Sequence, residues 1–75
     1  MDYENWKFEI QLSDVARLLN RVERRGYFTR GEAEFLELFF CGLLPSGVEE
    51  RLEREYQRLY EKARRLARAL PIKAR

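Results

Sequence analysis

The sequence predicts a mostly α-helical fold, in which a small three-helix domain follows a short N-terminal β-strand or extended arm. Two amphipathic segments, 14–25 and 47–70, carry apolar residues at helical spacing. Between them, residues 28–44 are apolar on almost every side of a helical projection. Residues 5–12 instead alternate apolar and polar side chains. A chain of this length makes one small domain, so we expect a single domain over residues 1–75.

The N-terminal segment NWKFEIQL, residues 5–12, alternates strictly. Its apolar side carries Trp6, Phe8, Ile10 and Leu12, and its polar side carries Lys7, Glu9 and Gln11. A period of two predicts a half-buried strand, with a helical turn or an extended arm as the alternative. No second run in the sequence has this pattern, and a lone strand leaves its backbone groups unpaired. We expect such a strand to pair with a second copy or with a partner protein.

The first helix is expected over residues 14–25. Ser13 is a suitable N-cap, and Gly26 stands where a left-handed residue ends many helices. The central helix is expected over 30–44, because Thr29 and Glu32 have the spacing of a capping box and Pro45 disfavours helix before it. A helix so apolar must be covered on several sides, which predicts that it is buried between its neighbours.

The third helix is expected over residues 47–70, after a second capping box formed by Ser46 and Glu49. It has an apolar seam at a spacing of four and three residues, made of Leu52, Tyr56, Leu59, Ala63, Leu66 and Leu70. We expect this seam to pack on the central helix, with pairing to the same helix of another subunit as the alternative. The tail, residues 71–75, follows a helix-ending proline and is expected to be frayed.

Composition limits the chemistry that this chain can perform. The sequence has no histidine and one cysteine, Cys41, so it can form neither the usual zinc sites, nor a nucleophile–histidine pair, nor an intrachain disulfide. It also lacks a glycine-rich phosphate loop. We therefore expect no catalytic residue, no metal and no cofactor, and a binding protein rather than an enzyme.

The N-terminal residues lack a signal-peptide pattern, and no apolar run approaches the roughly 20 residues of a membrane span. These features predict a soluble, cytoplasmic protein without a membrane partner.

Charge is unevenly distributed, although the net charge is only +2. Residues 1–45 carry six basic and eight acidic side chains, whereas residues 46–75 carry nine basic and five acidic ones. One stripe of the third helix contains Arg51, Arg54, Arg58, Lys62 and Arg65. Such a stripe suits a phosphate backbone or an acidic protein surface, and a solvated helix face is the alternative. A second basic group lies on the first helix and contains Arg17, Arg21, Arg24 and Arg25.

The order strand, helix, short glycine turn and helix resembles the ribbon–helix–helix DNA-binding family of the Arc, MetJ and ParD type. The resemblance covers residues 6–44 and is carried by KFEIQLS (7–13), DVARLLNRVERRG (14–26) and YFTRGEAEFLELFF (27–40). It implies a dimer in which the strands of two chains form a ribbon. Lys7, Glu9 and Gln11 would then face the major groove, and Thr29 and Arg30 would approach phosphate.

Two function classes follow from the sequence. One is a small dimeric DNA-binding transcriptional regulator, and the other is a helical protein-interaction module, such as an inhibitor or adaptor, that docks on a larger protein. The candidate residues for DNA or an acidic partner are Lys7, Gln11, Thr29, Arg30, Arg51, Arg54, Arg58, Lys62 and Arg65. The candidate residues for a protein interface are Trp6, Phe8, Ile10 and Tyr60.

Overall fold

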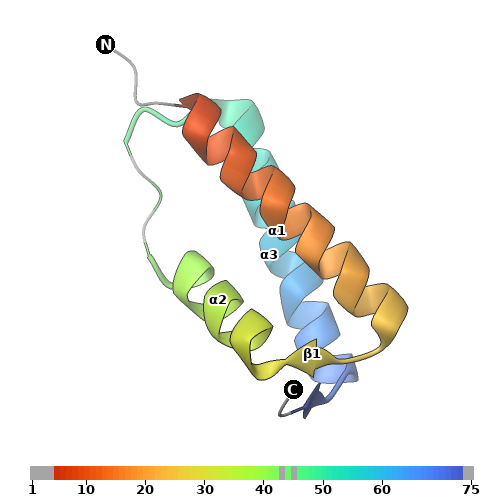
Figure 1. Cartoon of the computed structure of the whole chain (residues 1–75). Helices are drawn as coiled ribbons and strands as arrows, with labels where there is room; N and C mark the ends of the chain where they lie inside the picture. Colours follow the sequence, from red (N-terminus) through yellow and green to blue (C-terminus); the bar gives the residue numbers. More distant parts are fainter. Residues whose placement is uncertain (1–4, 43, 45, 74–75) are drawn as a thin grey trace.

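A computed structural model describes residues 5–42, 44 and 46–73 of the chain. Its elements are, in order, α1 (Asn5–Arg25), β1 (Phe28–Thr29), α2 (Arg30–Cys41), α3 (Glu50–Ala69) and β2 (Ile72–Lys73). Figure 1 shows α1 and α3 side by side along their length, with the shorter α2 beside them. The predicted mostly α, three-helix fold is confirmed. Helices α1 and α3 run in the same direction. Helix α2, which comes between them in the sequence, runs in the opposite direction.

The core is the seam between α1 and α3. Val15, Leu19 and Val22 of α1 are completely buried. They face the predicted apolar seam of α3, in which Leu52, Tyr56, Leu59, Ala63 and Leu66 are buried. The prediction of these seam residues is confirmed, but their expected main partner was wrong, because the seam packs chiefly on α1, while Tyr56 at its edge also contacts rings of the central helix.

The predicted N-terminal strand or arm is wrong for the described residues 5–12, which form the first turns of α1. Phe8 and Leu12 continue the spacing of Val15, Leu19 and Val22, so the segment satisfies the helical period as well as the alternating one. A helix pairs its backbone groups internally, whereas a lone strand would leave them unpaired. Ser13 accordingly lies inside α1 and does not cap it.

Asn5 joins the start of α1 to the start of α3. Its side-chain carbonyl accepts a hydrogen bond from the Glu49 N–H at 3.0 Å, and its amide donates to the Gly47 carbonyl at 3.3 Å. The predicted capping box of Ser46 and Glu49 is therefore wrong. Helix α3 begins at Glu50, and the side chain of Glu49 makes no capping hydrogen bond. The buried side chain of Asn5, on α1, instead pairs the backbone groups of the turn before α3.

Helix α2 lies at the periphery, so the prediction of a buried central helix is wrong. Leu36 is its one buried residue, and Leu38 is 77% exposed. The fold measures 42 × 17 × 17 Å, which is too narrow to enclose a helix about 10 Å wide on every side. Helix α2 also ends at Cys41, three residues before its predicted end at Leu44. Leu43, in the last turn of the predicted helix, and Pro45, which follows it, are outside the described residues.

An aromatic cluster attaches α2 to the other two helices. The ring of Phe39 lies 6.3 Å from that of Phe8 on α1 and 5.9 Å from that of Tyr56 on α3. The ring of Phe40 lies 5.3 Å from both Tyr56 and Tyr60. The Phe8–Phe39 pair is stacked and the others are tilted or edge-on, all of which are favourable for aromatic pairs. The inner side of α2 is therefore held by rings while its outer side stays exposed.

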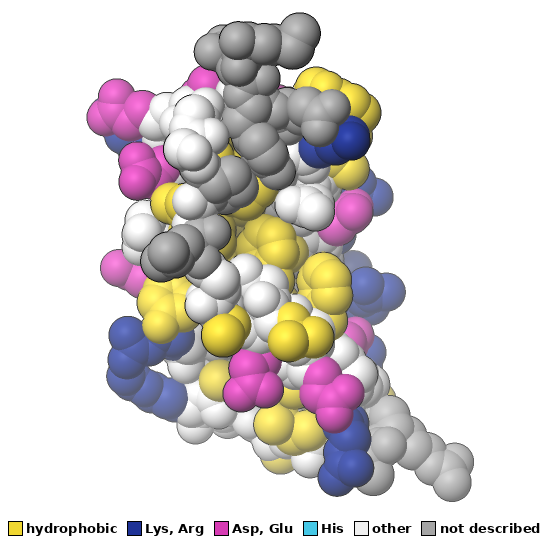
Figure 2. Space-filling model, turned by 90° about the vertical axis from the view of Figure 1, so that its left-hand side faces the viewer, with side chains coloured by type: hydrophobic (Ala, Val, Ile, Leu, Met, Phe, Trp, Pro, Cys, Tyr) yellow, Lys and Arg dark blue, Asp and Glu magenta, His cyan; other side chains and the backbone are white. Residues whose placement is uncertain are grey.

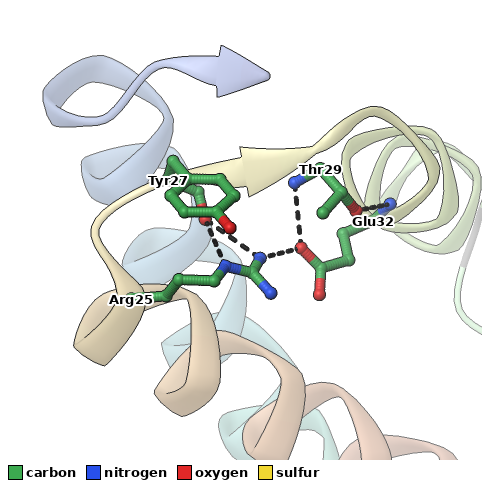
Figure 3. Close-up of polar contacts among 4 residues, drawn as sticks. All are labelled: Arg25, Tyr27, Thr29 and Glu32. Atoms are coloured by element: carbon green, nitrogen blue, oxygen red, sulfur yellow. Dashed lines mark hydrogen bonds and ion pairs between the residues drawn. The ribbon is translucent and has the colours of Figure 1, made fainter. Parts of the chain in front are cut away.

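A polar joint fixes the start of α2 (Figure 3). The predicted capping box is confirmed, since the Glu32 N–H donates to the Thr29 hydroxyl at 3.2 Å and the Thr29 N–H donates to the Glu32 carboxylate at 3.0 Å. The Arg25 guanidinium bonds the same carboxylate and the Tyr27 carbonyl. Gly26, with φ +90°, makes the predicted left-handed turn between the helices.

The C-terminal segment returns to this joint. Strands β1 and β2 pair in parallel, with Phe28 opposite Ile72 and Thr29 opposite Lys73, and the Phe28 N–H donates to the Pro71 carbonyl at 2.9 Å. The predicted fraying of 71–75 is therefore wrong for residues 71–73, because the backbone groups of β1 give them partners. Residues 74–75 lie outside the described residues.

Truncation of the seam should destabilise the fold far more than truncation of the outer face of α2. We expect Leu19→Ala to lower the free energy of unfolding by about 2–5 kcal/mol, because Leu19 is completely buried. The matched variant Leu38→Ala should change it by less than about 0.5 kcal/mol. Urea denaturation measures both values, and similar losses would contradict the assignment of the core to α1 and α3.

The joint should give stability that depends on pH. Burial raises the pKa of Glu32, but the hydrogen bonds from Thr29 and Arg25 outweigh it and hold the pKa below its ordinary value. The ionised carboxylate therefore stabilises the fold above that ordinary value, and this contribution is lost as the pH falls through the lowered pKa.

We expect Glu32→Gln to cost about 1 kcal/mol at neutral pH and progressively less in acid. The control Glu37→Gln removes an exposed carboxylate from the same helix and should cost less than about 0.5 kcal/mol. Denaturation at several pH values measures both, and a cost for Glu32→Gln that does not change with pH would refute this role of the charge.

Candidate functional site

An apolar groove lies between α2 and α3. Its volume is about 510 Å³, within the range of protein ligand sites. Its apolar lining comes from both helices and both strands and consists of Phe28, Ala33, Leu36, Phe40, Tyr60, Ala63, Ala67 and Ile72. Three alanines are among these lining residues, and the groove continues the aromatic cluster toward the β1–β2 end.

The edges of the groove carry opposite charges. Glu34 and Glu37 stand on the α2 side and Arg64 on the α3 side, with Arg30 at the first residue of α2. Figure 2, which looks onto the α2 side of the molecule, shows hydrophobic side chains gathered in the middle of this face with acidic and basic side chains around them. The apolar surface extends outside the groove over the exposed Leu38 and Phe35.

Tyr60 of α3 lines the wall of the groove, and Tyr56 of the same helix supports the neighbouring Phe40 from outside the groove. The Tyr60 ring packs on the ring of Phe40, and the Arg64 guanidinium lies 5.8 Å from the centre of the Tyr60 ring. Tyr56, one turn earlier, donates its hydroxyl hydrogen to the Phe40 carbonyl at 3.4 Å. Burial raises the pKa of Tyr56, so it stays a neutral donor at physiological pH. The expected interface residue Tyr60 is thus half-buried in the groove wall rather than free on the surface.

Ion pairs within the chain occupy most of the predicted basic stripe of α3. Arg51 bonds Glu9 of α1 at 3.1 Å and Glu49 at 2.8 Å, and the hydrogen bond to Glu9 raises its pKa. Three further pairs join Arg54 to Glu50, Arg58 to Glu55, and Lys62 to Glu23 of α1. Among the residues that the structure describes, Arg65 is the one member of the stripe without an acidic partner. The glutamates in these pairs neutralise much of the positive charge that the sequence shows along this stripe of α3.

The second basic group keeps its charge on the surface, with one exception. Arg25 turns into the joint with Glu32. Arg17, Arg21 and Arg24 border a shallow depression of about 640 Å³, together with Asp14, Leu18 and Phe35. Within the described ranges, Arg17 contacts only Asp14, at 3.5 Å, and Arg21 and Arg24 have no ion pair.

The remaining predicted site residues are dispersed because residues 5–12 are helical. Trp6 and Ile10 are more than half exposed, whereas Phe8 is 4% exposed and lies in the core. Lys7 and Gln11 are exposed on α1, but Glu9, expected beside them, pairs with α3.

At the start of α2 the two predicted phosphate contacts also separate. The half-buried Thr29 is used as the helix cap, and the exposed Arg30 stands at the edge of the groove.

Sequence reasoning missed the groove itself. Its small lining residues are Ala33 on α2 and Ala63 and Ala67 on α3, and these residues carry no recognisable chemistry. The signal that could have found it is the pair of alanines four residues apart on α3, since small side chains on one helix face leave space beside a neighbour. Ile72 joins the lining only because β2 returns to β1.

Within residues 5–42, 44 and 46–73, no helix is long and apolar enough to cross a membrane. In the same part of the chain, no group of three acidic, cysteine or histidine side chains is placed to hold a metal ion. Searches against family models, curated proteins and solved structures find no significant match to this chain, so no family is assigned to it.

Proposed function

We propose that this chain is a non-enzymatic interaction module that docks on a larger protein by receiving an amphipathic helix of that partner between α2 and α3. The observation that carries this proposal is the groove of about 510 Å³, apolar along its floor and charged along its edges. Amphipathic helices bind grooves of this kind through apolar side chains spaced three and four residues apart. Large exposed apolar patches rimmed by polar residues are typical of interaction sites.

The charges at the edges specify the pattern of the partner helix. Glu34 and Glu37 along α2 favour basic side chains on one flank of the incoming helix. Arg64 along α3 favours acidic side chains on the other flank. A helix with an apolar ridge between one basic and one acidic flank therefore complements this groove better than a helix with flanks of one sign.

The small residues that line the groove determine which side chains of the partner helix it could accept. Ala33, Ala63 and Ala67 leave room for large apolar side chains of a partner, and the surrounding rings of Phe40 and Tyr60 provide a rigid wall. Anchors of this kind, buried at the centre of an interface, supply most of its binding energy.

A dimeric DNA-binding regulator is the leading prediction from the sequence, with the protein-docking module as its alternative, and the geometry supports the regulator less. The ribbon that the resemblance implies would use residues 7–13, which lie in α1. The α3 stripe is paired with acids at four of its five positions. The homodimer prediction loses the pairing of strands as its basis, and what supports it now is the exposed apolar groove, which a second copy could also cover.

Blocking the groove should abolish peptide docking. The probe is a fluorescent helical peptide with a leucine ridge, lysines on one flank and glutamates on the other. Ala67→Trp fills the groove, and the matched control Ala69→Trp places the same ring on the opposite side of α3. Fluorescence anisotropy should show at least about tenfold weaker binding, or roughly 1.4 kcal/mol, for Ala67→Trp only. Peptides with lysines on both flanks, or glutamates on both, should bind less tightly than the mixed peptide.

Equal binding by both tryptophan variants would refute the groove as the docking site, as would a lack of affinity for the mixed peptide. Circular dichroism of both variants establishes that the fold is retained. Light scattering tests whether a second copy of the chain occupies the groove instead. A dimer that dissociates in Ala67→Trp but not in Ala69→Trp would assign the groove to that second copy.

A further inference from the structure

The outer face of α1 carries a pattern that the docking groove does not use. At 100° per residue its members fall within a sector of about 60°. They are Trp6, Ile10, Arg17, Arg21 and Arg24. This face points away from the seam, because the residues of α1 that pack on α3 lie on its opposite side. It is also separate from the groove, which lies between α2 and α3.

The arginines of this face remain available to an anion. In the described part of the chain, Arg21 and Arg24 have no acidic partner. Arg17 contacts Asp14 at 3.5 Å, and both side chains are largely exposed, so this pair is weak. The contrast with α3 is direct, since Arg54 and Arg58 are equally exposed but each is paired with a glutamate on its own helix.

Two exposed aromatic side chains lie along this face, one beside the arginines and one near the start of α1. Phe35 of α2 borders the same depression as the three arginines and is 46% exposed, with its ring stacked on that of Phe39. Trp6 lies on the same helix face about 16 Å from Arg17 along the axis, and it is 59% exposed. A row of cations with flat rings beside it offers two kinds of contact at once: charge for phosphate and a stacking surface for a base.

We propose that the outer face of α1, together with Phe35, binds single-stranded nucleic acid. Arg17, Arg21 and Arg24 contact backbone phosphates, while Phe35 and Trp6 stack on bases. Proteins that bind single strands combine a positively charged track with aromatic platforms in this way. Duplex DNA suits the face less well, because its bases are already stacked on each other and do not reach the rings. The proposal does not depend on the docking of a protein helix in the groove.

An anionic membrane is the other surface that arginines and tryptophan can contact. A helix that lies in a membrane interface has a continuous apolar face flanked by its basic residues. On α1 the apolar residues of the outer face, Trp6 and Ile10, occupy only its first turns, and the arginines follow them along the same line. This arrangement fits a strand that runs along the helix better than it fits a lipid surface.

The test compares two charge-matched variants of the full chain. Fluorescence anisotropy with a labelled oligothymidylate of about 15 nucleotides measures binding at roughly 50 and 200 mM salt. Replacing Arg21 and Arg24 by glutamine should weaken binding about tenfold and reduce the salt slope by about 1.4, or 0.7 for each lost phosphate contact. Replacing Arg54 and Arg58 by glutamine removes the same charge from α3 and should change the affinity less than about twofold.

Stacking has its own readout. Trp6 is the only tryptophan of the chain, so its fluorescence should be quenched when the oligonucleotide binds, and Phe35→Ala should weaken binding while circular dichroism stays unchanged. The proposal is overturned if the oligonucleotide does not bind at low salt, or if both double variants lose affinity equally. It is also overturned if a duplex of the same length binds more tightly, or if vesicles of anionic lipid bind through Arg21 and Arg24 while the oligonucleotide does not.

Discussion

The parallel pairing of α1 and α3 is the constraint on which the rest of the molecule depends. Two helices that run in the same direction need a connection that returns the chain to the starting end, and α2 lies on that return path. Most of the seam lies between α1 and α3, where Val15, Leu19 and Val22 are completely buried. Helix α2 is consequently added to one side, where the aromatic cluster and the Arg25–Glu32 joint hold it. The groove and the exposed face of α2 both result from this one-sided attachment.

The same pairing decides which charges are neutralised. Acids on one edge of α1 meet bases on one edge of α3, with Glu9 opposite Arg51 near the start of both helices and Glu23 opposite Lys62 near the end of α1. These pairs are exposed and individually weak, so their effect on stability is small. Their effect on the surface is larger, since they leave the outer arginines of α1 as a basic patch in which Asp14, beside Arg17, is the acid that borders the depression.

The sequence predicted what is local. The α3 seam, the Thr29–Glu32 capping box and the left-handed Gly26 depend on residues close together in the chain, and each is found. Which helix packs against which is not a local property, and the spacing of apolar residues within one helix does not reveal it. Residues 5–12 alternate as in a strand, and the helix is decided by Phe8 and Leu12, which join a seam whose other half lies about 40 residues away, while Trp6 and Ile10 stay exposed.

The candidate sites also have a part that is visible in the sequence and a part that depends on how the helices pack. The arginine stripe of α3 is visible in the sequence, but its partners Glu9 and Glu23 come from another helix. The groove is lined by residues of both α2 and α3, so finding it requires the return path of α2 to be known.

Pairing the first helix with the last has a consequence for how the chain acquires its fold. Contacts such as that between Glu9 and Arg51, or between Asn20 and Lys62, join residues 42 positions apart. A bundle of neighbouring helices forms from short-range contacts and folds quickly, whereas contacts of this separation raise the contact order and slow the reaction. During synthesis the apolar stripe of α1 has no partner until most of α3 has left the ribosome. For that interval Phe8, Leu12 and Leu19 stay exposed, which makes the nascent chain more prone to aggregation than the finished domain.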